Sequence, residues 1–173
     1  MKKYIVYLFL LSNLFVFNLA ISNENFVIDF SKVLNESTAG KQAQNFLKNK
    51  LNKDVEKFNA EEKKLRDEEK DLINQKKIIS AEEYKNKVDD LRQKVGNLQK
   101  KRADSLNSIA KTRADARAQL LKSLNPILEK FMNEKGITLV FDKSVVLANK
   151  RELDITDQII ELLNQNLKSL NLK

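Results

Sequence analysis

The sequence predicts an α+β protein that is mostly α-helical: a long antiparallel helical hairpin, forming a coiled-coil arm, projects from a small β-strand body with a C-terminal helix. Three observations predict this class. Val, Ile, Leu, Met, Phe and Tyr make up 19 of the 81 residues in 42–122, but 27 of the 70 residues in the flanking segments 23–41 and 123–173. The middle segment repeats its apolar residues at heptad spacing, and short strand-like runs lie in the flanks. The flanks can therefore form a core, whereas the middle is suited to an arm.

The first 22 residues have the pattern of a secretory signal peptide. Two lysines precede the apolar run YIVYLFLLSNLFVF, and Ala20 and Ser22 place small residues at the −3 and −1 positions of a cleavage site. An uncleaved membrane anchor is the competing interpretation. However, Ser12, Asn13 and Asn18 interrupt a stretch that is already near the lower limit of roughly 17 residues for a spanning helix. We therefore expect export into an oxidising compartment, which suits a chain without cysteine and without a lipid-anchor site.

Residues 42–122 are predicted to form the helical hairpin arm, with its tip at 75–80. This segment has one glycine, Gly96, no proline, and abundant Lys, Glu, Gln, Ala and Leu, the composition of long helices. The second helix is expected to continue into the body, with a bend near Pro126 and a stop at Gly136. The heptad positions before and after the tip are Leu51, Val55, Phe58, Glu62, Leu65, Glu69 and Leu72, then Tyr84, Val88, Leu91, Val95, Leu98, Arg102, Ser105 and Ile109.

The tip fixes the predicted register of the hairpin. Ser80 followed by Glu83 has the spacing of a capping box, which starts the second helix directly after the tip. Acids at seam positions, such as Glu62 opposite Val95, are predicted to lean outward and keep their charge in water. Such a seam should be weakly stable and able to bend. Folding the chain back at the tip predicts three apolar layers, Leu72 opposite Tyr84, Leu65 opposite Leu91, and Phe58 opposite Leu98.

The flanks are predicted to form a body that completes itself by oligomerisation. Strands are expected at about 25–30, 137–141 and 145–148, the last two as a hairpin, followed by an amphipathic helix at about 155–170. A sheet this small with open edges invites completion by other copies. A ligand pocket is the competing interpretation of the same apolar residues. The predicted oligomer core consists of Phe26, Val27, Ile28, Phe30, Leu139, Val140, Phe141 and Val145.

The composition excludes several function classes. The chain has no His, no Cys and three Gly, so we predict no catalytic residue, no metal site, no cofactor-binding loop and no enzyme activity. The net charge of +8 favours anionic partners, such as acidic polypeptides, anionic lipid or lipopolysaccharide. Nucleic acid is not expected as a partner, because the chain is predicted to be exported and the arm lacks the aromatic residues that stack on bases.

The end segments carry a resemblance to a known family. NFVIDFSKVL, ITLVFDKSVVLA and LDITDQIIELL, placed around a long charged hairpin, resemble the Skp (OmpH) periplasmic chaperones of Gram-negative bacteria. The resemblance implies a periplasmic homotrimer in which strands of three subunits build a small β-barrel and three arms surround a cavity like tentacles. It also implies an ATP-independent holdase that binds unfolded outer-membrane proteins. A structural coiled-coil protein of the cell envelope, without chaperone activity, is the alternative.

The arm tip supplies the candidate residues for binding such a client. Apolar groups beside a capping turn suggest a surface that grips an unfolded chain. For Ile79 the alternative is a hydrophobic staple on Tyr84, and for Ile78 it is a single exposed apolar residue. The charges of the arm are alternatively the solvated exterior of a coiled coil. The candidate client-binding residues are Leu72, Ile73, Lys76, Lys77, Ile78, Ile79 and Tyr84.

Overall fold

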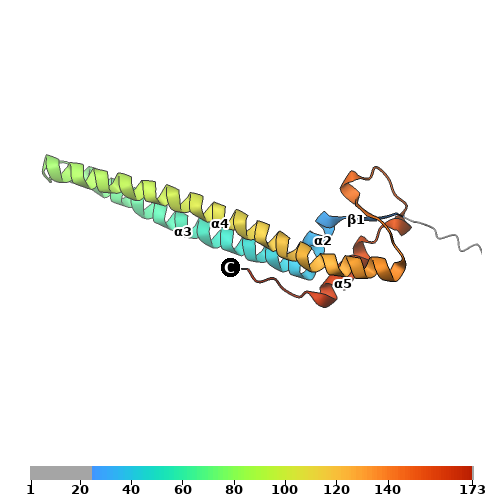
Figure 1. The fold of residues 1–173 in the computed structure, drawn as a ribbon. Helices are drawn as coiled ribbons and strands as arrows, with labels where there is room; N and C mark the ends of the chain where they lie inside the picture. The colour runs from blue at the N-terminus through green and yellow to red at the C-terminus, as the bar shows by residue number, and fades with distance from the viewer. Residues whose placement is uncertain (1–24, 173) are drawn as a thin grey trace, which may run out of the picture.

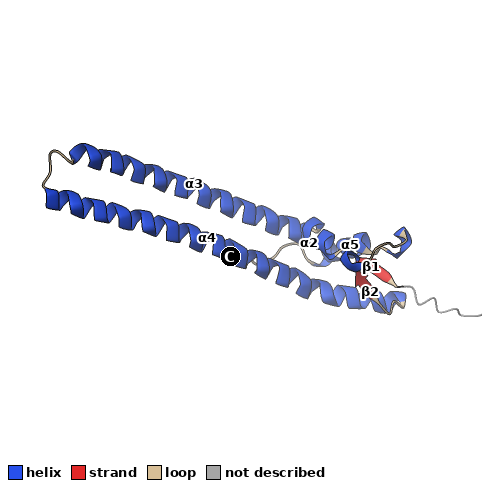
Figure 2. Cartoon of the chain, turned by 90° about the horizontal axis from the view of Figure 1, so that it is seen from above, coloured by secondary structure: helices blue, strands red, loops and turns tan. Residues whose placement is uncertain are grey.

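The computed structural model describes residues 25–172, so the predicted signal peptide lies outside the described residues. The chain folds into a long two-helix arm and a small α+β body at one end of it (Figure 1). Helices α3 (Thr38–Gln75) and α4 (Ala81–Lys135) run side by side to the tip in both views (Figures 1 and 2). At about 1.5 Å per residue, they are about 57 Å and 80 Å long, so α4 outruns α3 and enters the body.

Local signals fix the ends of α4 as predicted. The Ser80 hydroxyl accepts a hydrogen bond from the Glu83 backbone N–H at 3.1 Å, which caps the first turn. The Glu83 carboxylate forms an ion pair with Lys87. At the other end, Gly136 adopts φ 65°, a left-handed conformation that suits glycine and ends the helix. Between these ends, α4 continues unbroken through Pro126.

The predicted register of the arm is wrong by about one helical turn on each helix. The residue that faces a given position of α3 therefore lies one heptad further along α4 than predicted. Leu65 and Leu98 line the same depression between the helices, and Leu72 shares another with Leu91. Lys87 donates to Gln75, the last residue of α3, at 3.0 Å. The first turns of α4 therefore extend past the end of α3, whereas the prediction placed the turn symmetrically between the two helices. The turn geometry sets this offset, and the heptad spacing does not report it.

The body contains a two-stranded parallel sheet in place of the predicted hairpin. Strands β1 (Phe26–Ile28) and β2 (Val140–Asp142) pair in parallel, with Phe26 beside Val140. On its other side, β1 bonds to the segment before the last helix, because the Ile155 N–H donates to the Val27 carbonyl. Within the described residues β2 pairs only with β1, so its outer edge stays unpaired.

Three predicted strand boundaries need correction. The predicted strand at 145–148 is absent, because the Asp142 side chain accepts from the Ser144 N–H and starts a 3-10 turn at Lys143–Val145. The predicted strand at 25–30 is shorter, because the Asp29 side chain caps helix α2 (Phe30–Glu36) and Phe30 is helical. The strand predicted at 137–141 is instead β2, at Val140–Asp142, because the Ile137 N–H still donates to the Met132 carbonyl at the end of α4.

The last elements return to the body and the base of the arm. A second 3-10 turn (Arg151–Leu153) leads into helix α5 (Thr156–Asn166), which ends before the predicted residue 170. Beyond α5 the chain runs back toward the arm, as Figure 1 shows. There, Asn171 exchanges two backbone hydrogen bonds with the Gln119 side chain, at 3.1 and 3.2 Å, which hold this tail against α4.

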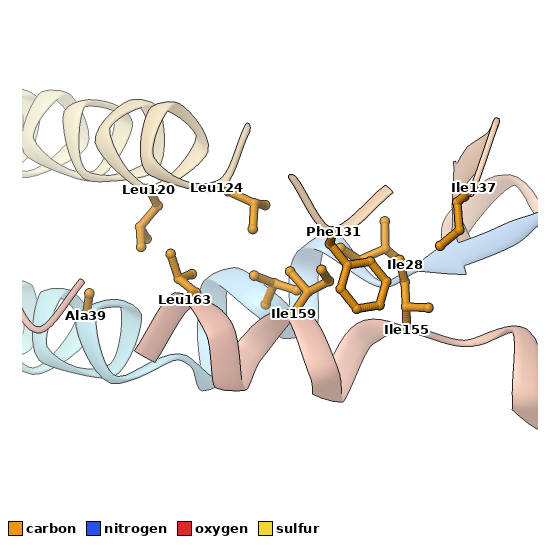
Figure 3. Close-up of a cluster of buried hydrophobic side chains, with 10 residues drawn as sticks. Ile28, Ala39, Leu120, Leu124, Phe131, Ile137, Ile155, Ile159 and Leu163 are labelled. Atoms are coloured by element: carbon orange, nitrogen blue, oxygen red, sulfur yellow. The ribbon is translucent and has the colours of Figure 1, made fainter. Parts of the chain in front are cut away.

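The core lies where α4, α5, β1 and the start of α3 meet. Leu120 and Leu124 of α4 point toward Leu163 and Ile159 of α5, and Ile28 lies beside Phe131 (Figure 3). Burial of such side chains is the main stabilising contribution, at about 1.5–3 kcal/mol for each. The core residues are Ile28, Val33, Ala39, Leu120, Leu124, Phe131, Ile137, Ile155, Ile159 and Leu163.

The junction between α2 and α3 depends on one glycine. Ser37 is buried and caps α3, accepting from the Gly40 N–H at 3.2 Å. A Cβ atom at Gly40 would lie 1.9 Å from the Leu34 carbonyl oxygen. Only glycine therefore permits the close approach of α2 to α3 that joins the body to the arm. No helix in the described part of the chain has the length and apolar character needed to cross a membrane.

Candidate functional site

The tip separates the predicted apolar residues into exposed and buried ones. Ile78 is 82% exposed and Ile73 is 59% exposed, so both present apolar surface to solvent. Leu72 is only 8% exposed, because it faces α4 in the seam between the helices. The apolar surface of the tip is therefore carried by Ile73 and Ile78, and Leu72 supports it from beneath.

Ile79 and Tyr84 lie in the positions of a hydrophobic staple. Ile79 immediately precedes the Ser80 cap, Tyr84 follows one turn later, and both side chains are half-buried. The partial burial of both side chains favours a structural role for Ile79. Ile78 has no corresponding position, since a staple uses one residue before the cap.

The two lysines of the tip add positive charge beside this apolar surface. Lys76 lies 5.8 Å from the centre of the Tyr84 ring, within the range of a cation–π contact. Lys77 is exposed and forms no ion pair with any described residue. The tip thus combines exposed isoleucines with an available cation, a combination suited to an anionic or amphipathic polypeptide.

The middle of the arm is held partly by ion pairs that cross between the helices. Arg102 binds Glu62 at 2.6 Å, Lys101 binds Glu61 at 3.0 Å, and Lys94 reaches Glu68 at 2.9 Å. Glu62 also pairs with Arg66, and the hydrogen bonds from Arg66 and then Arg102 lower the pKa of Glu62 to about 2. The predicted position of Glu62 opposite Val95 is therefore wrong, because the register places Glu62 opposite Arg102.

The eight predicted oligomer-core residues fall into two groups. Val27 and Ile28 are buried within the single chain, and Phe26, Phe30 and Val140 pack against the core. The other three, Leu139, Phe141 and Val145, are exposed. Leu147, which the sequence reasoning left out although it lies in the same apolar run, is fully exposed. We call Leu139, Phe141, Val145 and Leu147 the β2 face: Phe141 lies on the strand with the unpaired edge, Leu139 directly precedes it, and Val145 and Leu147 follow it in the chain.

The described residues contain no cluster of three or more acidic side chains that could hold a metal ion. The prominent features are instead surfaces: the apolar and cationic tip, the charged arm and the β2 face. Surfaces of this kind can bind polypeptide chains.

Comparisons with known proteins agree with this fold. A family model described as outer membrane protein (OmpH-like) matches residues 25–163. The chain is also similar to a crystal structure from Caulobacter crescentus CB15, named as a candidate outer membrane chaperone (OmpH-like). That similarity has a TM-score of 0.81 at 20% sequence identity and covers 85% of this chain and 87% of the other. No curated protein matches the chain.

Proposed function

This chain belongs to the OmpH-like outer membrane protein family, and we propose from this premise that it is a periplasmic chaperone rather than an enzyme. In this proposal the protein binds unfolded outer-membrane proteins between its arms, without ATP, and prevents their aggregation on the way to the outer membrane. Export through the predicted signal peptide would deliver it to the periplasm.

The observation that carries this proposal is the form of the arm. A hairpin about 57 Å long projects from the body and presents exposed Ile73 and Ile78 at its end. An arm that served only as a spacer would gain nothing from isoleucines in water at its tip. A holdase, by contrast, needs exposed apolar groups, because unfolded clients offer their own apolar side chains.

The charge of the arm supports capture over a distance. Residues 42–122 carry 21 basic and 14 acidic side chains. A cationic surface raises the association rate of acidic unfolded chains, and many weak contacts then hold them. The same charge is compatible with anionic lipid or lipopolysaccharide as further partners.

A homotrimer is the assembly state in this proposal. The β2 face exposes four large apolar residues next to an unpaired strand edge, and a sheet of two short strands is marginal by itself. Pairing of this edge with other copies would bury the face and arrange several arms around a shared cavity.

The test is aggregation of an outer-membrane β-barrel protein diluted from urea, followed by light scattering with and without the mature chain. The expected result is suppressed scattering and a soluble complex whose mass equals three chains plus one client. If the client aggregates unhindered while the chain is folded and oligomeric, the proposal fails. A structural coiled-coil role in the envelope would then be the better explanation.

A further inference from the structure

A groove at the base of the arm offers a second apolar surface, far from the tip. It has a volume of about 740 Å³ and lies between α2, α3 and α4. This volume is within the range of about 300–1,000 Å³ that is typical of ligand sites. Its apolar lining consists of Leu34, Ala43, Leu47, Leu51, Ile109, Ala116 and Leu120.

The charge around this base groove is of one sign. Lys48, Arg113 and Arg117 line it, and no acidic residue does. None of the three cations forms a salt bridge within residues 25–172. Arg117 interacts with an acid only at longer range. That acid is Asp142, whose pKa is lowered mainly by hydrogen bonds from Ser144 and further by the charge of Arg117.

Other depressions of the arm differ in this respect. The one around Leu65 and Leu98 also contains cations, but acidic residues line it as well, and Glu68 and Glu61 pair there with Lys94 and Lys101. The base groove therefore differs from these depressions because no acidic residue lines it and none of its three cations forms a salt bridge with a described residue.

We propose that the base groove binds a segment of the unfolded client in which large apolar side chains alternate with carboxylates. The apolar side chains would cover the leucines of the floor, and the carboxylates would pair with Lys48, Arg113 and Arg117 at the rim. That the occupant is a client segment rests on the proposed function. The groove itself does not, because it is formed within one chain. Each arm then has two contact regions, one at its tip and one at its base.

The chain offers closely matched variants for a test. Leu51 and Phe46 lie on the same helix and are both 38% exposed, but only Leu51 lines the base groove. Likewise Arg113 lines the base groove, whereas Lys111, an exposed cation two residues away, does not. Leu51→Asn and Arg113→Gln therefore test the groove, and Phe46→Asn and Lys111→Gln are their controls.

The probe is a short fluorescein-labelled peptide of alternating leucine and glutamate, and its anisotropy is measured with the full mature oligomer. Leu51→Asn and Arg113→Gln should each weaken binding by roughly five- to tenfold, and the controls should stay within about twofold. A peptide with lysine in place of glutamate should bind at least about tenfold more weakly. An unfolded outer-membrane protein should displace the acidic peptide.

Each other outcome contradicts part of the proposal. If the wild-type chain does not bind the acidic peptide, the site is refuted, and this includes the case in which a second copy fills the groove. The site is also refuted if the groove variants bind the peptide as well as their controls do. If peptide binds as expected but the unfolded client does not displace it, the client is not the occupant. Because peptide binding needs no aggregation assay, a chain that binds peptide but suppresses no aggregation refutes the holdase function and leaves the groove standing.

Discussion

The two helical glycines, Gly40 and Gly96, should respond in opposite directions to the same substitution. In a helix interior, Gly→Ala normally stabilises by about 1 kcal/mol, because alanine has less conformational entropy to lose. At Gly96 nothing lies within 4 Å of the added Cβ, so the full gain is expected. For a chain of this length, about 1 kcal/mol raises the melting temperature by about 2–4 °C.

At Gly40 the structure predicts a loss instead. The added Cβ would lie 1.9 Å from the Leu34 carbonyl oxygen and 2.9 Å from the Ser37 hydroxyl. Because the nearest atom belongs to the backbone, α2 must move away from α3. Overpacking of this kind costs about 1–3 kcal/mol, and occasionally more. A contact of 1.9 Å with a backbone atom belongs at the upper end of this range, about 3 kcal/mol. After subtraction of the helix-propensity gain of about 1 kcal/mol, we expect Gly40→Ala to lose about 2 kcal/mol, or about 4–8 °C.

The assay is thermal unfolding followed by circular dichroism at 222 nm, at one protein concentration, because the stability of an oligomer depends on concentration. Gly96→Ala is the matched control for Gly40→Ala. If Gly40→Ala melts as high as Gly96→Ala, the close approach of α2 to α3 does not exist as described. The account of how the body is joined to the arm would then be wrong.

Four further predictions concern the tip, the β2 face and the charges of the arm. Ile78→Ser should weaken client binding and leave the melting temperature unchanged, since the Ile78 side chain is 82% exposed. Leu106→Ser, away from the tip, is its control. Lost stability with unchanged affinity would contradict a binding role for Ile78. Phe141→Asp should yield monomers in size-exclusion chromatography with light scattering but keep the helical circular dichroism signal, and an intact oligomer would count against assembly through the β2 face. Because the pKa of Glu62 is lowered to about 2 from 4.5, its stabilising contribution should be present above pH 4.5 and be lost as the pH falls toward 2. Glu62→Gln should therefore flatten the profile of melting temperature against pH in this range. An unchanged profile would contradict the contacts of Glu62 with Arg66 and Arg102. Client association measured from low to physiological salt should become slower and weaker, and insensitivity to salt would refute capture by the cationic arm.

The sequence by itself determined the features that depend on neighbouring residues. Heptad spacing predicted the long hairpin, Ser80 predicted the start of α4, and Gly136 predicted its end. The exposure of Ile78 could also be suspected, because a single staple does not account for two adjacent isoleucines. These signals are readable because helix periodicity, capping and left-handed glycine conformations act over a few residues.

Tertiary structure alone decided the features that join distant parts of the chain. The parallel pairing of β1 with β2 replaced a predicted local hairpin, because the edge of β1 was available and Asp142 turned the chain away after β2. The arm register moved by about one turn on each helix, since the turn geometry outweighs the heptad pattern. The base groove combines residues of three helices, so no contiguous motif could reveal it. In each case the deciding energy comes from contacts between segments far apart in sequence, and local propensity contains no information about which segments will meet.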